Sequence, residues 1–251
     1  MSAILELHGV TKAYDAYTVV DNFNLTVNEG ELRCLLGPNG AGKTTTMDLI
    51  TGRQKMTSGK VVFQGRKISG MSEHRICQQG IGRKFQIPAV FKDLTVQENL
   101  RVALTRTTNP FMNMIEFGRG SGRERLQQVV ELVGLQERLD ELSGNLSHGE
   151  TQWLEIGMVL TQNPKLLLMD EPTAGMTEQE TQKTSDIFNR LKGEHTLIVV
   201  EHDMAFVREI ADIITLMHFG KTLSEGPMDQ VENDPKVREV YLGSEGITDA
   251  A

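Results

Sequence analysis

The residues with the clearest chemical potential form a glycine-rich run. Its members are Gly37, Pro38, Asn39, Gly40, Ala41, Gly42, Lys43, Thr44 and Thr45. The run fits G-x-x-x-x-G-K-[ST] after an apolar segment and at the start of a predicted helix, so its backbone N–H groups can point at one bound anion. Lys43 can pair with the β- and γ-phosphates, and the Thr44 hydroxyl is a hard oxygen ligand for Mg²⁺. The complete motif predicts nucleotide binding in preference to an incidental glycine-rich turn.

Two adjacent carboxylates follow another apolar segment. Leu166–Met169 is predicted to be a strand, and Asp170 and Glu171 come directly after it. In a P-loop fold we expect such a strand to lie beside the phosphate-loop strand, which lets Asp170 reach the Mg²⁺ coordination sphere. Glu171 is then expected on the γ-phosphate side, where a carboxylate can orient an attacking water. The alternative is a pair of solvated acids at a strand end, which the phosphate-binding motif upstream disfavours.

Four weaker features gain meaning from their order along the chain. They are Tyr14, Gln86 after the predicted strand Ile81–Phe85, the run Leu146–Glu150 at a helix start, and Glu201-His202-Asp203 after the predicted strand Leu197–Val200. Each alone is compatible with ordinary packing or solvation. Together with the two motifs above, they make the chain resemble the ATP-binding cassette subunit of ABC transporters over nearly its whole length.

This resemblance implies that the nucleotide is ATP, held with Mg²⁺, and that the protein is an ATP hydrolase coupled to transport. Tyr14 corresponds to the aromatic residue that stacks on adenine, and His202 to the histidine that holds the γ-phosphate and the attacking water. Gln86 corresponds to the glutamine that senses Mg²⁺ and couples to the membrane subunit. The resemblance thus gives Glu171 and His202 as catalytic residues, and Thr44, Gln86 and Asp170 as metal-site residues.

The run Leu146, Ser147, His148, Gly149 and Glu150 resembles the family's signature loop, usually written LSGGQ. Ser147 and Gly149 are retained, so a hydroxyl and a close-approach glycine can face a γ-phosphate at a helix N-terminus. His148 replaces a glycine, and Glu150 replaces the glutamine. A carboxylate near a triphosphate is unfavourable unless it points away or pairs with a cation.

The resemblance further implies a head-to-tail dimer, with each ATP between one chain's phosphate loop and the other chain's signature loop. The altered signature loop, and Thr177 in place of a usual dimer-contacting aspartate, favour a second, different cassette subunit as partner. The other expected partners are transmembrane permease subunits and, indirectly, a periplasmic solute-binding protein. The chain is therefore expected to lie peripherally at the cytoplasmic face of the inner (plasma) membrane.

Local segments narrow the resemblance to importers of branched-chain amino acids and urea. They are Gly82–Phe91, Gly149–Gly157, Val200–Met204 and Val240–Gly243. GRKFQ-x-P-x-VF and LSHGE-x-QWLEIG look most like the urea-type importer's ATP-binding subunit, so urea uptake is the main expectation. The alternatives are a cassette of a branched-chain amino acid or other ABC transporter, a soluble ABC protein acting on DNA or ribosomes, and a P-loop GTPase or kinase. No N-K-x-D guanine-reading motif supports the last.

The composition limits the class of protein. Of 251 residues, 39% are hydrophobic, 24% charged and 5% aromatic, and 26 Lys and Arg against 34 Asp and Glu give a net charge of −8. These values are typical of a globular α/β protein, and the acidic balance argues against broad nucleic-acid binding. No segment approaches the roughly 20 apolar residues of a membrane span, and no secretory signal is expected at the N-terminus. Cys34 and Cys77 fit no disulfide or metal-binding pattern.

The hydrophobic pattern predicts the elements that position these motifs. Strands are expected at Ile4–Leu7, Asn24–Val27, Leu32–Leu36, Val61–Phe63, Ile81–Phe85, Leu166–Met169, Leu197–Val200 and Ile213–Met217. Helices are expected at Lys43–Thr51, Val96–Leu104, Leu126–Val133, Thr177–Leu191 and Met204–Ala211, and a surface loop at Thr107–Gly122. Trp153 is interpreted as core packing.

Together these elements predict an α/β fold, a P-loop nucleotide-binding core (the ABC cassette) with an antiparallel β region and an inserted helical subdomain. Residues 1–251 are expected to form a single ABC ATPase domain. The nucleotide-binding core with its β subdomain is predicted to comprise 1–86 and 163–251, and the helical signature subdomain 87–162.

Overall fold

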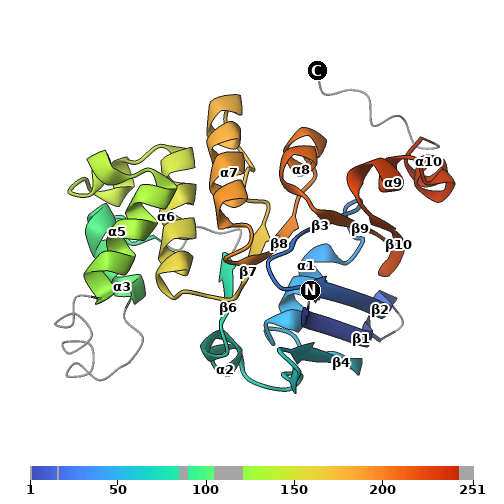
Figure 1. Ribbon diagram of the computed structural model, residues 1–251. Coiled ribbons are helices and arrows are strands. Elements are labelled where there is room, and N and C mark those ends of the chain that lie inside the picture. The colour runs from blue at the N-terminus through green and yellow to red at the C-terminus, as the bar shows by residue number, and fades with distance from the viewer. Residues whose placement is uncertain (1, 16, 85–89, 105–120, 243–251) are drawn as a thin grey trace. The chain divides into compact units, whose positions relative to one another are not determined.

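The computed structural model describes residues 2–15, 17–84, 90–104 and 121–242, and the chain divides into two compact units (Figure 1). Unit 1 comprises Met1–Gln79 and Lys192–Ala251, and unit 2 comprises Gly80–Leu191. The phosphate loop and His202 belong to unit 1, whereas the signature loop, Asp170 and Glu171 belong to unit 2.

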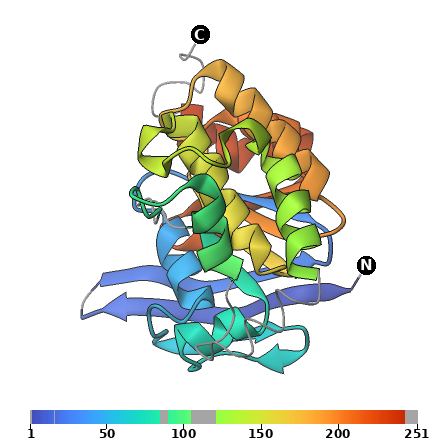
Figure 2. The same cartoon turned by 90° about the vertical axis from the view of Figure 1, so that its left-hand side faces the viewer.

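Unit 1 contains an antiparallel sheet with the strand order β2-β1-β4-β5. Its strands are β1 Ala3–Tyr14, β2 Tyr17–Asn28, β4 Ser58–Phe63 and β5 Arg66–Lys67. The β1–β2 pair is seen as the two long blue strands of Figure 2. Along β2, buried Phe23, Leu25 and Val27 alternate with exposed polar residues, the pattern of a sheet with one face in the core. The expected antiparallel β region is confirmed.

The second set of strands in unit 1 carries the phosphate loop. It consists of β3 Leu32–Leu36, β8 Thr196–Val200, β9 Ile213–His218 and β10 Lys221–Gly226. Every residue of β3 and β8 is buried, as in central parallel strands. The buried Arg33 on β3 is compensated by Glu31 and Glu225, at 2.6 Å and 2.8 Å. The helices of this unit are α1 Lys43–Ile50, α2 Glu73–Gln78, α8 Met204–Ile210, α9 Met228–Glu232 and α10 Pro235–Leu242.

The pairing of β3 corrects one expectation from the sequence. β3 pairs in parallel with β8 and with β9, so both of its edges are occupied. The expectation that the strand bearing Asp170 lies directly beside the phosphate-loop strand is therefore wrong. The two cysteines are both free, with Cys34 buried on β3 and Cys77 exposed on α2.

Unit 2 combines a parallel strand pair with helices. The strands are β6 Ile81–Lys84 and β7 Leu166–Asp170. The helices are α3 Val96–Leu104, α5 Ser121–Val133, α6 His148–Thr161 and α7 Glu178–Leu191, with short 3-10 turns η1 Gln136–Arg138 and η2 Ser143–Asn145. α3, α5 and α6 pack against one another (Figure 2).

Two details of unit 2 bear on the sequence expectations. Ser121 and Gly122 begin α5, so the predicted loop ends earlier than expected, and its residues 107–120 lie outside the described residues. Trp153 on α6 is 6% exposed, and its indole N–H donates to the Thr184 hydroxyl at 3.0 Å. Its interpretation as core packing is confirmed.

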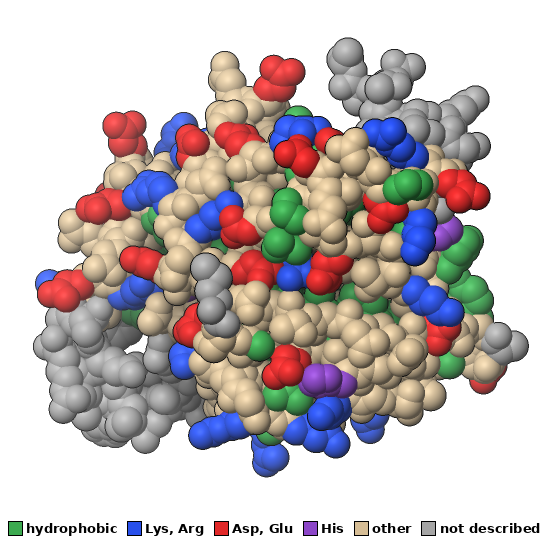
Figure 3. Space-filling view, turned by 45° about the vertical axis from the view of Figure 1, so that its right-hand side comes forward, with side chains coloured by type: hydrophobic (Ala, Val, Ile, Leu, Met, Phe, Trp, Pro, Cys, Tyr) green, Lys and Arg blue, Asp and Glu red, His purple; other side chains and the backbone are tan. Residues whose placement is uncertain are grey.

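The surface carries charges of both signs. Acidic and basic side chains are interspersed on the face drawn in Figure 3. In the described part of the chain, no helix has the length and apolar character needed to cross a membrane.

Candidate ATP site and signature loop

The phosphate loop of unit 1 joins β3 to α1 and has a backbone that requires glycine. Gly42 is the N-cap of α1 with φ 99°, and no side chain caps that helix end. A Cβ on Gly42 would lie 2.7 Å from the Val19 carbonyl oxygen, and one on Gly37 would lie 2.3 Å from the Met217 carbonyl oxygen. Because the loop is closely packed against neighbouring backbone and opens a helix, its N–H groups are held where an anion can bind.

Lys43 and Thr44 are the first two residues of α1. The Lys43 ammonium donates to the carbonyl oxygens of Gly37 and Pro38, at 2.7 Å and 3.1 Å, and so lies over the loop itself. Thr44, in the first turn of α1, is exposed, so its hydroxyl is accessible to a ligand. These positions suit a cation and a hydroxyl that act on phosphate and on Mg²⁺.

Tyr14, at the end of β1, is 47% exposed. Its hydroxyl donates to the side-chain oxygen of Gln54, and the Lys12 ammonium lies 4.4 Å from the centre of its ring. A ring fixed at its hydroxyl and in contact with a cation, yet partly open to solvent, can accept a flat base by stacking. Adenine stacking at Tyr14 stays a prediction.

His202 follows β8, as expected, and its side chain is 70% exposed. Its backbone N–H donates to the carboxylate of buried Glu201 at 3.1 Å. Asp203 caps α8 by accepting the N–H groups of Ala205 and Phe206, at 2.9 Å and 3.0 Å. The preceding carboxylate and the following cap fix the backbone on both sides of an exposed imidazole, whose Nδ1 lies 3.8 Å from the Glu201 carboxylate.

In unit 2, Asp170 and Glu171 end the buried strand β7. The Asp170 carboxylate lies 3.5 Å from the Arg83 guanidinium on β6, and both side chains are 4% exposed. Glu171 has φ 46°, a left-handed conformation that is unfavourable for a residue with a Cβ and is concentrated at functional sites. The strained turn redirects the chain immediately after the buried aspartate. Asp170 and Thr44 both offer the hard oxygen atoms that Mg²⁺ prefers.

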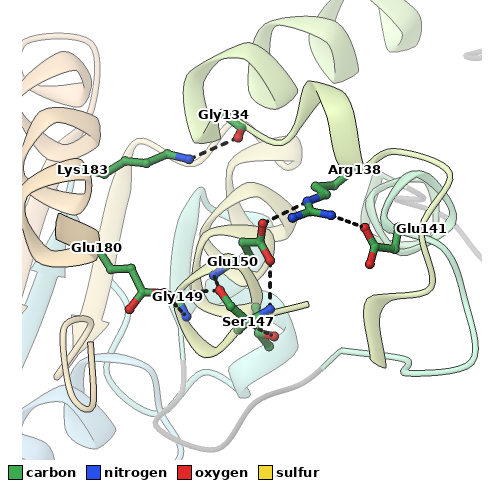
Figure 4. Close-up of polar contacts among 9 residues, drawn as sticks. Gly134, Arg138, Glu141, Ser147, Gly149, Glu150, Glu180 and Lys183 are labelled. Carbon is green, nitrogen blue, oxygen red and sulfur yellow. Dashed lines mark hydrogen bonds and ion pairs between the residues drawn. The ribbon is translucent and has the colours of Figure 1, made fainter. Parts of the chain in front are cut away.

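The signature loop begins α6 with a capping box. Ser147 is the N-cap: its Oγ accepts the Glu150 N–H at 3.1 Å, and the Glu150 carboxylate accepts the Ser147 N–H at 2.9 Å (Figure 4). The other Glu150 oxygen pairs with the Arg138 guanidinium at 3.1 Å, and Arg138 also pairs with Glu141 at 2.8 Å. The unusual carboxylate of the signature loop therefore folds back onto its own helix and pairs with a cation.

The two other departures from the family pattern also make defined contacts. The His148 ring nitrogen Nε2 lies 2.9 Å from the Ala174 carbonyl oxygen, which links the signature loop to the turn after Glu171. Thr177 precedes α7, and its Oγ accepts the Glu180 N–H at 3.3 Å while the Glu180 carboxylate accepts the Thr177 N–H at 3.0 Å. Thr177 thus forms a second capping box in place of the usual aspartate.

Sequence reasoning missed two residues that contact the signature loop, and one predicted residue of the ATP site is not described by the structure. Arg138, the cation beside Glu150, stands in a 3-10 turn with no motif of its own. Glu180 also contacts the signature loop, although the T-x-x-E pattern from Thr177 could have identified its capping role. Gln86, predicted to contact Mg²⁺, lies outside the described residues.

Comparison with known proteins decides the family. A family model described as ABC transporter matches residues 20–174, and one described as branched-chain amino acid ATP-binding cassette transporter matches residues 221–247. The chain belongs to the ABC transporter ATPase family. It is similar to the high-affinity branched-chain amino acid transport ATP-binding protein BraF of Pseudomonas aeruginosa, with 35% identity over 96% of this chain and 98% of that one.

Solved structures agree with this assignment. The ADP conformation of MJ1267, an ATP-binding cassette of an ABC transporter, has a TM-score of 0.83 and 31% identity, covering 97% of this chain and all of that one (100%). A dimeric post-hydrolysis cassette, MJ0796 bound to ADP and Pi, has a TM-score of 0.74 and 25% identity, covering 89% and 98%. The predicted ABC cassette fold is confirmed, and the chain is an ATP hydrolase of the ABC transporter type. Cassettes of this family dimerise and pair with membrane permease subunits.

Proposed function

We propose that this chain is the ATP-hydrolysing subunit of an importer for branched-chain amino acids. The observation that carries the proposal is the similarity to BraF, which extends over 96% of this chain and 98% of that one. The C-terminal match over residues 221–247 points to the same group. These findings favour branched-chain amino acids over urea, the solute expected from the sequence.

Urea is the second candidate because two segments favour it. GRKFQ-x-P-x-VF from Gly82 and LSHGE-x-QWLEIG from Leu146 look most like a urea-type cassette. Both surround positions that contact ATP or the permease in the proposed assembly, and neither contacts the transported solute. The solute is chosen by the permease and the binding protein, so transport itself must separate the two candidates.

The catalytic roles follow from the chemistry of the described residues. Lys43 and the N–H groups of the phosphate loop neutralise and hold the phosphates. The hydroxyl of Thr44 and the carboxylate of Asp170 would hold Mg²⁺, which when bound supplies further charge neutralisation. Glu171 orients the attacking water and takes its proton, and His202 fixes the γ-phosphate. Tyr14 stacks on the adenine.

A second cassette completes the site. Ser147 and Gly149 of this chain contact the γ-phosphate of the ATP that the second cassette holds, and that subunit's signature loop serves the ATP held here. The altered signature loop and Thr177 favour a different cassette subunit as the partner. ATP then stabilises the closed dimer and hydrolysis releases it, a population shift that drives the permease.

The coupling surface to the permease is proposed at Phe91 and Lys92, which precede Thr95 and α3, at the cytoplasmic face of the membrane. Phe91 is 52% exposed, and its backbone N–H and C=O are held by the buried Asn99 side chain at 2.8 Å and 3.0 Å. An exposed aromatic on a fixed backbone suits a protein contact. Substitution of Phe91 or Lys92 is expected to abolish permease pull-down with ATP binding intact, and unchanged pull-down would refute this surface.

The proposed solute can be tested in proteoliposomes that contain the permease, both cassettes and the binding protein. Leucine-loaded binding protein is expected to stimulate MgATP hydrolysis, and urea is expected to have no effect. The Lys43→Ala variant is the control, because it removes the phosphate-binding cation and should abolish hydrolysis under both conditions. Stimulation by urea alone would replace the proposed solute with the second candidate.

A further inference from the structure

Glu180 contacts the signature loop although no motif assigns it there. It lies in the first turn of α7, and its Oε1 accepts two hydrogen bonds from the N-terminus of α6 (Figure 4). The donors are the Ser147 hydroxyl and the Gly149 N–H, both at 3.2 Å. The Oε2 of the same carboxylate accepts the N–H and the hydroxyl of Thr177, both at 3.0 Å. One carboxylate therefore joins the starts of two helices.

The glycine of the signature loop is what permits this contact. A Cβ on Gly149 would lie 2.3 Å from Glu180 Oε1 and 2.5 Å from its carboxyl carbon. A methyl group at that position would push the carboxylate off the helix end. Gly149 thus provides space that the Glu180 carboxylate occupies in the single chain.

The occupant carries a negative charge at neutral pH. Hydrogen bonds, first from the Thr177 backbone and also from the Thr177 and Ser147 hydroxyls and the Gly149 N–H, hold the pKa of Glu180 below its usual range. The N-terminus of α6 favours an anion at this point. Glu150, the other acid nearby, uses its two oxygens for the Ser147 N–H and for Arg138. Of these two acids, only Glu180 accepts hydrogen bonds from both the Ser147 hydroxyl and the Gly149 N–H.

We propose that Glu180 sets the ATP affinity of the signature half-site by competing with the γ-phosphate for Ser147 and Gly149. The inference rests on the proposed function, in which these two donors contact the γ-phosphate held by the second cassette. Two anions cannot share the same two donors without strong repulsion. Closure of the ATP-bound dimer therefore requires the Glu180 carboxylate to leave α6, while its contacts with Thr177 keep it at the start of α7.

The competition also distinguishes ATP from ADP. ADP lacks the phosphoryl group that would take the place of the carboxylate, so the dimer with ADP leaves Glu180 on α6. The carboxylate thereby raises the ATP concentration needed for closure and favours opening after hydrolysis. This role is specific to the γ-phosphate and leaves nucleotide binding at the phosphate loop unchanged.

The test compares Glu180→Gln with Glu178→Gln in the assembled transporter. Both variants remove one negative charge from the first turn of α7, and Glu178 is exposed. Glutamine at 180 keeps the shape but weakens the charge-assisted hydrogen bonds and the repulsion. The MgATP concentration for half-maximal hydrolysis is expected to fall about tenfold in Glu180→Gln, equivalent to about 1.4 kcal/mol. It is expected to stay unchanged in Glu178→Gln, and the Kd of each isolated chain for ADP should equal that of the wild type.

Three results would overturn the inference. A higher half-maximal concentration in Glu180→Gln would mean that the carboxylate supports the active signature loop. The same shift in both variants would indicate a general charge effect, and no shift would show that Glu180 does not compete.

Hydrogen exchange at the Gly149 amide of the isolated chain gives an independent check. The exchange rate is expected to be faster in Glu180→Ala, and an unchanged rate would refute the contact.

Failure of the proposed function gives a different pattern. In that case the wild-type assembly would not hydrolyse MgATP, or its hydrolysis would survive Lys43→Ala. Failure of the Glu180 inference alone would leave Lys43-dependent hydrolysis intact. The half-maximal MgATP concentration would then be unshifted or raised in Glu180→Gln, or shifted equally in Glu180→Gln and Glu178→Gln.

Discussion

Replacing Ser147 by alanine is expected to reduce ATP turnover far more than it reduces stability. The hydroxyl caps α6 by accepting the Glu150 N–H at 3.1 Å. Loss of an N-cap hydroxyl costs about 1 kcal/mol, within a range of roughly 0.5–2 kcal/mol. For a chain of 251 residues, that change lowers Tm by about 2–4 °C, which leaves the fold intact at assay temperature.

The effect on turnover has a separate origin. The Ser147 hydroxyl is proposed to contact the γ-phosphate of the ATP held by the second cassette. Removing one preorganised donor from a site where charge develops typically lowers turnover at that site by about 10²–10³-fold. We therefore expect a loss of activity out of proportion to the small change in Tm.

Thr95→Ala is the matched control. Thr95 caps α3 with the same kind of capping box: its Oγ accepts the Glu98 N–H at 3.2 Å, and its own N–H donates to the Glu98 carboxylate at 2.8 Å. This variant should show a similar small fall in Tm with normal hydrolysis. Thermal unfolding followed by circular dichroism measures the stability. MgATP hydrolysis is measured in assembled transporters that also carry Glu171→Gln, so that turnover reports the half-site that Ser147 serves. Equal loss of turnover in both variants, or normal turnover in Ser147→Ala, would refute the proposed role of the hydroxyl.

Two further predictions concern charge within unit 2. Glu155→Gln is expected to lower the free energy of unfolding by about 3–5 kcal/mol, because it removes the carboxylate that lies 3.4 Å from the buried Lys84 ammonium. The double variant Lys84→Met with Glu155→Leu replaces the ion pair by two apolar side chains and should recover most of that loss. Urea unfolding measures this, and a double variant less stable than the single one would contradict it. The pKa of Glu180 is lower in the folded chain than its unfolded-state value of about 4.5. The ionised carboxylate therefore stabilises the fold above about pH 4.5, and this contribution is lost as the pH falls through the folded-state pKa. The stability gap between wild type and Glu180→Gln should accordingly be constant above about pH 4.5 and close below it, and a gap that widens in acid would show the opposite linkage.

The local elements of the fold could be predicted because their signals are local. Leu32–Leu36, Leu166–Met169 and Leu197–Val200 are continuous apolar runs, which predict buried strands, and all three form such strands. Which strands pair with one another could not be predicted from these runs, because strand pairing joins segments that are far apart in the sequence. The wrong expectation for the neighbour of β3 came from this limit.

At the candidate site, too, motifs made of adjacent residues could be predicted, whereas contacts between residues distant in the sequence could not. The phosphate loop was predictable, since its glycines and its Lys-Thr pair are adjacent in the sequence. The sequence also posed the problem of Glu150 correctly, as a carboxylate that must turn away or pair with a cation. Arg138, its partner, could not be found without the fold. The reach of Glu180 to Ser147 likewise depends on where α6 and α7 begin in space.

Solute uptake by cells whose only copy of this chain carries Glu171→Gln tests whether ATP hydrolysis by this chain drives import. The change removes the proposed base and spares the phosphate loop, so ATP binding should persist while turnover falls by orders of magnitude. Uptake of labelled leucine is expected to be lost, and uptake of labelled urea is expected to stay unchanged. Loss of urea uptake alone would keep the mechanism and overturn the proposed solute. Normal uptake of both would contradict the claim that ATP hydrolysis by this chain drives either import.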